Sequence, residues 1–187
     1  METLDAIRKR CSLKLHLSKK PIEPEKIEQV LEAARLAPSA RNLQPWRFVV
    51  VKGDEAIEEL VLGAFPESNQ ALKNGSVVIL ICAREEDDVS REGRPYYLFD
   101  TGLAAENLML AATDLGLLTH PILSFDENEA KRILEIPDEY RVVLATPLSY
   151  PTEASYEDAA DERLRERTRK AIGEITYFGK WGVSKQV

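Results

Sequence analysis

The sequence lacks the motifs that assign many enzymes to a class directly. It has two cysteines and two histidines among 187 residues, which excludes a disulfide framework, and their spacing fits no zinc site. It contains no Gly-rich dinucleotide-binding motif, no P-loop and no Gly-x-Ser-x-Gly nucleophile motif. We therefore expect any chemistry to belong to a bound cofactor, for which the protein supplies position and electrostatics.

Long apolar runs and excess positive charge are also missing. The longest apolar run, residues 77–83, is too short to span a membrane, and no signal-peptide pattern follows Met1. The formal net charge of −7 argues against a general nucleic-acid binder. We expect a cytoplasmic protein with neither membrane nor nucleic acid as its partner.

The length suits a single domain, residues 1–187, with residues 152–187 as a C-terminal arm. Hydrophobic periodicity predicts helices over 4–10, 24–36, 55–62, 98–114 and 126–136, and strands over 47–51, 77–82 and 141–148. The run at 77–83 is typical of a strand that is buried on both faces. The apolar tail around 175–181 is expected to pack on the domain or on a partner subunit.

A turn between two prolines, Pro38 and Pro45, is the stretch around which the chain is organised. Proline fixes φ and prevents a continuing helix, and the short polar residues between the two can bind a ligand or cap the next element. Trp46 is expected to anchor the turn in the core. On spacing alone, a binding edge and a plain connector remain equally open.

Two basic segments each allow two interpretations. If residues 12–16 are extended, Ser12, Lys14 and His16 share one face and could meet an anion, with Leu13 and Leu15 on the other face. The alternative is a solvated edge strand. The arginine-rich segment 163–170 is either a phosphate site or a charged surface helix.

Several of these stretches together resemble the FMN-dependent nitroreductase family. The most specific are Arg10-Cys-Ser-Leu-Lys14 and the block 34–48, which includes Ala37-Pro-Ser-Ala-Arg-Asn-Leu-Gln-Pro-Trp46. They are supported by 100–116, by His120-Pro-Ile122, by Leu148-Ser-Tyr-Pro151, and by Arg169-Lys170 ahead of 174–181. The likeness covers nearly the whole chain, from about Ile7 to Trp181.

The resemblance implies an α+β fold, a sandwich in which a mostly antiparallel sheet is wrapped by helices. It also implies an intertwined homodimer that holds FMN in two equivalent clefts at the subunit interface. The apolar helix over 98–115 would then pack against its symmetry mate, and the apolar tail would embrace the partner subunit.

The resemblance further implies a set of FMN-binding residues. One subunit would contribute Arg10, Cys11, Ser12 and Lys14, the phosphate-binding Arg167 and Arg169, an amide at Gln70 facing the pyrimidine ring, and the backbone of Pro121, Ile122, Leu123 and Ser124 along the ring. The other subunit would contribute Pro38, Ser39 and Asn42. Three residues depart from the family pattern: Cys11 stands where many members have arginine or histidine, and Ser124 and Ser149 replace glycines.

The function that the resemblance implies is flavin-dependent oxidoreduction. NADH or NADPH would pass hydride to FMN, and a small acceptor, such as a nitroaromatic, a quinone or a flavin, would then be reduced in the same cleft by a ping-pong mechanism. No acid or base side chain is required, so no catalytic residue is named. An FMN-binding protein with little turnover and a flavin-dependent dehydrogenase or dehalogenase remain as alternatives.

Overall fold

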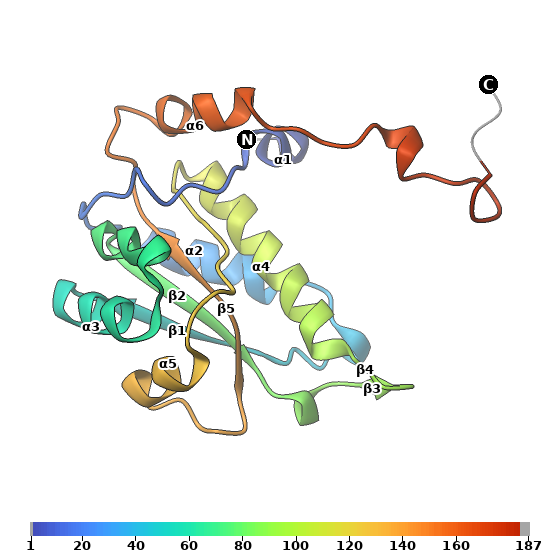
Figure 1. Cartoon of the computed structure of the whole chain (residues 1–187), viewed down its shortest axis with the longest axis horizontal. Coiled ribbons are helices and arrows are strands. Elements are labelled where there is room, and N and C mark those ends of the chain that lie inside the picture. Colours follow the sequence, from blue (N-terminus) through green and yellow to red (C-terminus); the bar gives the residue numbers. More distant parts are fainter. Residues whose placement is uncertain (1, 184–187) are drawn as a thin grey trace.

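The most apolar segment of the sequence forms the central strand of the fold. β2 (Val77–Ala83) lies between β1 (Trp46–Lys52) and β5 (Arg141–Leu148), and both pairings are antiparallel (Figure 1). All residues of β2 are buried, as predicted for a strand with both faces covered. This computed structural model describes residues 2–183.

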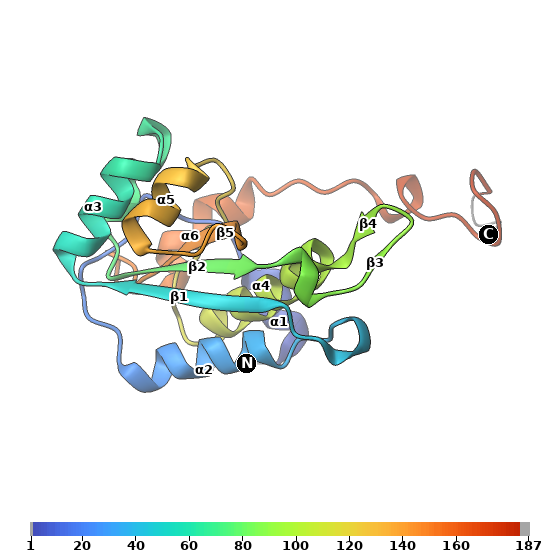
Figure 2. The same cartoon turned by 90° about the horizontal axis from the view of Figure 1, so that it is seen from below.

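Helices cover both faces of the sheet, which confirms the expected sandwich (Figure 2). Their bounds are α1 (Thr3–Lys9), α2 (Pro24–Arg35), α3 (Asp54–Ala64), α4 (Tyr96–Asp114), α5 (Glu127–Leu134) and α6 (Tyr156–Arg165). Successive side chains of β2 point to opposite faces. Ile79 and Ile81 therefore pack with α2 and α4, whereas Val78 and Leu80 pack with α3 and α5.

Short elements connect these layers. They are a two-stranded hairpin of β3 (Ser90–Arg91) and β4 (Arg94–Pro95), and the 3-10 turns η1 (Ala40–Asn42), η2 (Glu67–Asn74), η3 (Glu85–Asp87) and η4 (Ile172–Glu174). The turn η1 follows the first of the two prolines, and Trp46 is buried at the start of β1, as predicted.

Local sequence signals account for several helix ends. Pro24 occupies the first turn of α2, where its missing N–H costs no hydrogen bond. The Asp126 carboxylate caps α5 by accepting from the backbone N–H groups of Asn128 and Glu129. The Ser155 hydroxyl caps α6 in the same way, by accepting from the backbone N–H of Asp158. The helix α4 begins at Tyr96, two residues before the predicted start.

The segment that follows α1 differs from the predicted extended strand. The backbone bends over residues 14–16, and Leu15 is 75% exposed. Leu13 and Leu17 are the buried pair, packed with Tyr156 of α6. The prediction that Leu13 and Leu15 share one face was wrong, because this packing fixes a spacing of four residues rather than two.

Within the C-terminal arm, α6 packs on the body of the protein, and the segment that follows α6 extends away from the body (Figure 1). Its apolar side chains are exposed: Ile172, Ile175, Tyr177, Phe178 and Trp181. Trp181 is 88% exposed. Of the two expected placements, the structure does not show packing of the tail on its own domain, and packing on a partner subunit stays a prediction.

No helix within residues 2–183 is long and apolar enough to cross a membrane.

Replacement of Leu80 by alanine is predicted to destabilise the protein by about 2–5 kcal/mol, because Leu80 is fully buried in the central strand and alanine leaves a cavity. Urea unfolding followed by circular dichroism measures the change. The control is Leu62→Ala on the outer face of α3, where the side chain is 58% exposed and the expected change is within about 0.5 kcal/mol. Equal changes in the two variants, at equal protein concentration, would contradict the assignment of the core.

Candidate functional site

Two adjoining cavities, of about 270 and 280 Å³, lie between the N-terminal segment and α6. Ser12, Arg163 and Glu166 line both of them. The first is also lined by Leu13, Lys14, Leu15, His16, His120, Ala159 and Glu162, and the second by Arg10, Cys11, Arg167, Thr168 and Arg169. The structure thus brings the two basic segments of the sequence together around one region.

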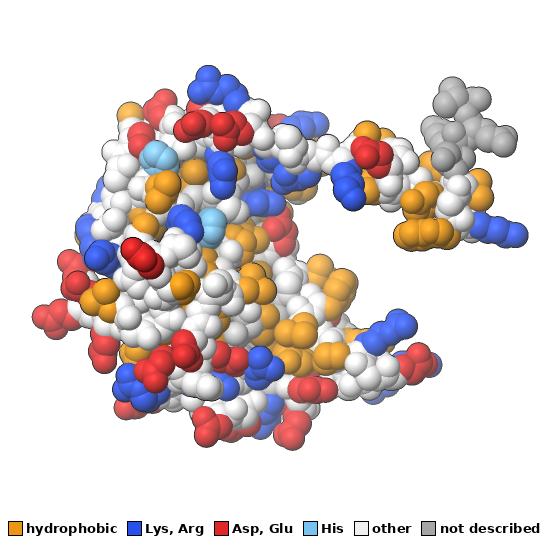
Figure 3. All heavy atoms as spheres, viewed as in Figure 1, with side chains coloured by type: hydrophobic (Ala, Val, Ile, Leu, Met, Phe, Trp, Pro, Cys, Tyr) orange, Lys and Arg blue, Asp and Glu red, His pale blue; other side chains and the backbone are white. Residues whose placement is uncertain are grey.

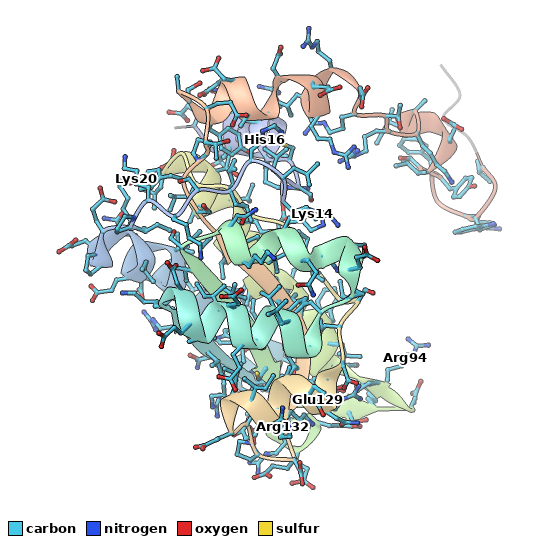
Figure 4. All side chains as sticks on the ribbon, turned by 60° about the vertical axis from the view of Figure 1, so that its left-hand side comes forward. Lys14, His16, Lys20, Arg94, Glu129 and Arg132 are labelled. Carbon is cyan, nitrogen blue, oxygen red and sulfur yellow. The ribbon has the colours of Figure 1, made fainter. Side chains whose placement is uncertain are left out.

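Lys14 is held in place by two hydrogen bonds. Its Nζ donates to the carbonyl oxygen of Ser68 and to Oδ1 of Asn69, each at 2.7 Å. Asn69 is 5% exposed, and its Nδ2 donates to the carbonyl oxygen of Ser124 at 3.3 Å. Figure 4 shows Lys14 beside the helical turn η2. A fixed ammonium and a fixed amide therefore lie next to the predicted ring-binding segment.

The neighbouring amide, Gln70, lies elsewhere. Its Nε2 donates to the carbonyl oxygens of Val61 and Phe65, at 3.0 and 2.8 Å, at the end of α3. The structure therefore places Asn69, rather than Gln70, beside Lys14. Sequence reasoning missed Asn69 because two consecutive amides in an irregular turn give no signal for which one faces inward.

Four arginines surround the second cavity. Arg10 has a buried Nε without a hydrogen-bond partner in the described chain, 3.6 Å from Oε1 of Glu106. Arg167 donates to the carbonyl oxygen of Arg10 at 3.2 Å, and Arg169 donates to that of Thr168 at 2.7 Å. Guanidinium groups in this number favour an anion such as phosphate.

Arg163 is the arginine that sequence reasoning left out of the site. It lines both cavities and forms no hydrogen bond or ion pair with the residues from 2 to 183. Its position within the predicted arginine cluster was the available signal. The rotation of α6 about its axis decides which arginine faces the cavities. It turns Arg163 inward, whereas Arg165 forms an ion pair with Asp161 at 2.7 Å.

His120 faces the same region. Its backbone N–H donates to Oγ1 of Thr146 at 3.1 Å, and its Nδ1 is buried without a partner among the described residues. Burial lowers the pKa of His120, and the positive charges of Lys14 and Arg163 lower it further. The imidazole is therefore neutral at pH 7.

The segment Pro121–Ser124 is anchored by Ile122. The N–H of Ile122 donates to the carbonyl of Ala145, and Ala145 returns the bond, at 2.8 and 2.9 Å. The next residue, Leu123, is 71% exposed, and its N–H has no acceptor within the described chain. Ser124 does not adopt the left-handed conformation that favours glycine, so its serine side chain brings no backbone strain.

The other two departures from the family pattern are structural. The thiol of Cys11 lies 3.6 Å from the hydroxyl of Tyr156, and burial raises the pKa of this thiol. Burial also raises the pKa of Tyr156 to about 12. The hydroxyl of Ser149 donates to the carbonyl of Ser18 and accepts from its N–H, at 2.8 and 3.0 Å, which ties the N-terminal segment to the end of β5.

A separate cavity of about 570 Å³ lies at the start of α4. Its lining residues are Pro38, Ser39, Ala40, Arg94, Pro95, Tyr96, Phe99, Asp100 and Leu103, none of which lines the two basic cavities. Figure 3 shows an open hollow between the arm and the body, with hydrophobic side chains along its wall. Pro38 and Ser39 are thus apart from the basic residues within one chain.

The turn between the two prolines is held in an unusual conformation. Arg41, Asn42 and Gln44 have φ values of 50°, 59° and 51°, in the left-handed region that non-glycine residues rarely adopt. The hydroxyl of Ser39 accepts from the N–H of Gln44 at 3.0 Å. The side chain of Asn42 is exposed and forms no hydrogen bond within the described chain, so its amide is free for a ligand.

Known proteins resemble this chain in sequence. The sequence model of the Nitroreductase family matches residues 7–150. A protein of Archaeoglobus fulgidus, named as a candidate NADH dehydrogenase/NAD(P)H nitroreductase, is 34% identical over 167 residues, which cover 87% of this chain and 93% of that protein.

Solved structures show the same fold. The crystal structure of a nitroreductase family protein from Clostridium novyi NT has a TM-score of 0.76 and 33% identity, and the match covers 98% of this chain and 97% of that one. A structure described as an oxidoreductase containing FMN has a TM-score of 0.78 and 27% identity, with 96% and 92% covered. From the match of the family model over most of its length, together with these relatives, the chain belongs to the nitroreductase family.

Proposed function

We propose that the chain is an FMN-dependent NAD(P)H oxidoreductase that works as a homodimer and reduces a small acceptor, such as a nitroaromatic, a quinone or a flavin. The observation that carries this proposal is the continuous basic region from Lys14 to Arg169, bordered by the free N–H of Leu123. Family membership and the names of the relatives support it.

The residues present fit FMN at both of its ends. A phosphate needs charged donors, and the buried Nε of Arg10, which has no hydrogen-bond partner in the described chain, is one such donor beside Arg163, Arg167 and Arg169. A flavin ring needs donors along its edges. The side chain of Asn69 accepts a hydrogen bond from the ammonium of Lys14 and donates one to the carbonyl oxygen of Ser124, so Lys14 and the segment Pro121–Ser124 lie close together.

When bound, FMN would supply the redox chemistry, with hydride from NADH or NADPH in one half-reaction and reduction of the acceptor in the next, in the same cleft. The protein itself would bind FMN and orient its ring. Lys14 provides a fixed positive charge, which stabilises the more negative, reduced form of a ring in contact with it. The N–H of Leu123 is a donor that would orient the ring. One cleft for both substrates accounts for the missing dinucleotide motif.

A second copy of the chain would complete each cleft with Pro38, Ser39 and Asn42, since none of these residues lines the basic cavities within one chain. The exposed apolar side chains of the arm, such as Phe178 and Trp181, would be covered by that second copy. In this proposal residues 1–187 form one domain, and the arm, 152–187, reaches the partner; its last four residues lie outside the described range. Two buried free thiols suit the reducing cytoplasm.

Purified protein is predicted to be yellow, to release FMN on denaturation, and to lose its flavin absorbance within seconds when NADH or NADPH is added without oxygen. Absorbance spectroscopy of the protein and of the extracted chromophore measures both properties. A protein that keeps its flavin colour with both nucleotides would be a binding protein with little turnover. A colourless protein that takes up no added FMN would contradict the proposal entirely.

Replacement of Lys14 by alanine is predicted to lower the midpoint potential of bound FMN by roughly 30 mV, which corresponds to about 1.4 kcal/mol for two electrons. The reason is loss of the positive charge that favours the reduced ring. A redox titration against a reference dye measures it. Lys20→Ala is the control, because the Lys20 ammonium lies 4.2 Å from the ring centre of Tyr150 and lines neither basic cavity. An unchanged potential in Lys14→Ala would remove Lys14 from the ring edge.

Replacement of Arg169 by alanine is predicted to weaken FMN binding about ten-fold while affecting riboflavin, which lacks the phosphate, much less. Fluorescence titration of the apoprotein with each ligand measures the two dissociation constants. Arg165→Ala is the matched control, because Arg165 is paired with Asp161 on the exposed side of α6. Equal losses for FMN and riboflavin would place Arg169 away from the phosphate.

A further inference from the structure

The cavity at the start of α4 contains one positively charged side chain that the proposed function does not use. Arg94 is the only cation that lines this cavity of about 570 Å³ within the described chain. Most of the other lining residues are apolar or aromatic, and they include Phe99, which is 69% exposed, and Leu103. The cavity therefore offers an aromatic surface on which a flat ring can stack and a cation that can meet an ionic group.

The guanidinium of Arg94 has no competing partner. It forms no hydrogen bond or ion pair with any residue between 2 and 183, whereas Nε of Arg91, on the same hairpin, lies 3.9 Å from Oε1 of Glu92. Asp100 also lines the cavity, but its side chain is 3% exposed and accepts from the N–H of Ala40 at 2.7 Å. Burial raises the pKa of Asp88, and the neighbouring carboxyl group of Asp100 raises it further.

The position of Arg94 is fixed by the fold. It pairs with Arg91 in the β3–β4 hairpin, and the following residue, Pro95, caps α4. The N–H of Tyr96 donates to the carbonyl of Val89 at 3.0 Å, which closes the base of the hairpin onto the helix. Figure 4 shows the Arg94 side chain projecting outward from the hairpin.

We propose that Arg94 selects substrates that join a flat aromatic ring to an anionic group, a carboxylate or a phosphate, with the ring against Phe99 and the anion on the guanidinium. This inference rests on the proposed function, because it concerns the substrates of the same cleft. The anion has two possible sources, the acceptor or the reduced nucleotide, whose 2′-phosphate distinguishes NADPH from NADH.

The acceptor arm of the test uses para-nitrobenzoate and its neutral analogue para-nitrobenzamide with the FMN-loaded enzyme. Arg94→Gln is expected to lower the ratio of kcat/KM for the anion to that for the amide about five-fold, because an ion pair in contact with solvent is worth at most about 1 kcal/mol. The preference of the parent enzyme for the anion is expected to weaken as salt is added. Arg91→Gln is the matched control, since Arg91 lies on the same hairpin and does not line the cavity.

The nucleotide arm measures the rate at which NADPH and NADH bleach the flavin without oxygen. An approximately five-fold fall in the NADPH-to-NADH ratio in Arg94→Gln identifies the nucleotide phosphate as the anion, whereas a fall confined to para-nitrobenzoate identifies the acceptor. Unchanged ratios in both arms, or equal falls in Arg91→Gln, overturn the role of Arg94. The proposed function still holds in that case if NADH or NADPH bleaches the flavin. A parent protein that takes up no FMN overturns both.

Discussion

A single hydrogen bond links the two most distinctive segments of the protein. The N–H of Ala40 donates to the buried carboxylate of Asp100 at 2.7 Å, which joins the turn between the two prolines to the first part of α4. The turn needs such an anchor, because Arg41, Asn42 and Gln44 all have positive φ and left-handed non-glycine residues raise the free energy of the folded state. With α4 packed against α2 and the sheet, the turn is held on a rigid base with the amide of Asn42 free.

Within one chain, the fold keeps two groups of candidate binding residues apart. The N-terminal segment and α6 place Lys14 and the arginines around one region, whereas the turn before η1 and the β3–β4 hairpin place Ser39 and Arg94 at another. No lining residue is shared between these regions. The exposed apolar arm adds a second surface that one chain leaves uncovered. A cofactor cleft made from both regions therefore points to two copies of the chain, and this is the centre of the proposed function.

Sequence reasoning reached the features that local pattern determines. The strand at Val77–Ala83 follows from its composition, and the family and its fold follow from motifs of fixed spacing. Long-range contacts decided the rest. The bend at Lys14 depends on a hydrogen bond to Ser68, fifty-four residues away, and on the packing of Leu13 with α6. The choice of Asn69 over Gln70 depends on the orientation of an irregular turn, and that of Arg163 on the rotation of a helix, neither of which a single sequence encodes locally.

A mixing experiment tests most directly whether two chains share each cleft. One chain would carry Arg169→Glu and the other Ser39→Glu, each placing a carboxylate where the anionic cofactor would bind, and differently tagged copies would be co-expressed and purified as the mixed dimer. Each variant alone is predicted to bind FMN poorly. The mixed dimer has one cleft with both substitutions and one with neither, so it should bind a single FMN with the affinity of the parent protein. A mixed dimer that binds FMN no better than the two variants alone would contradict the shared cleft.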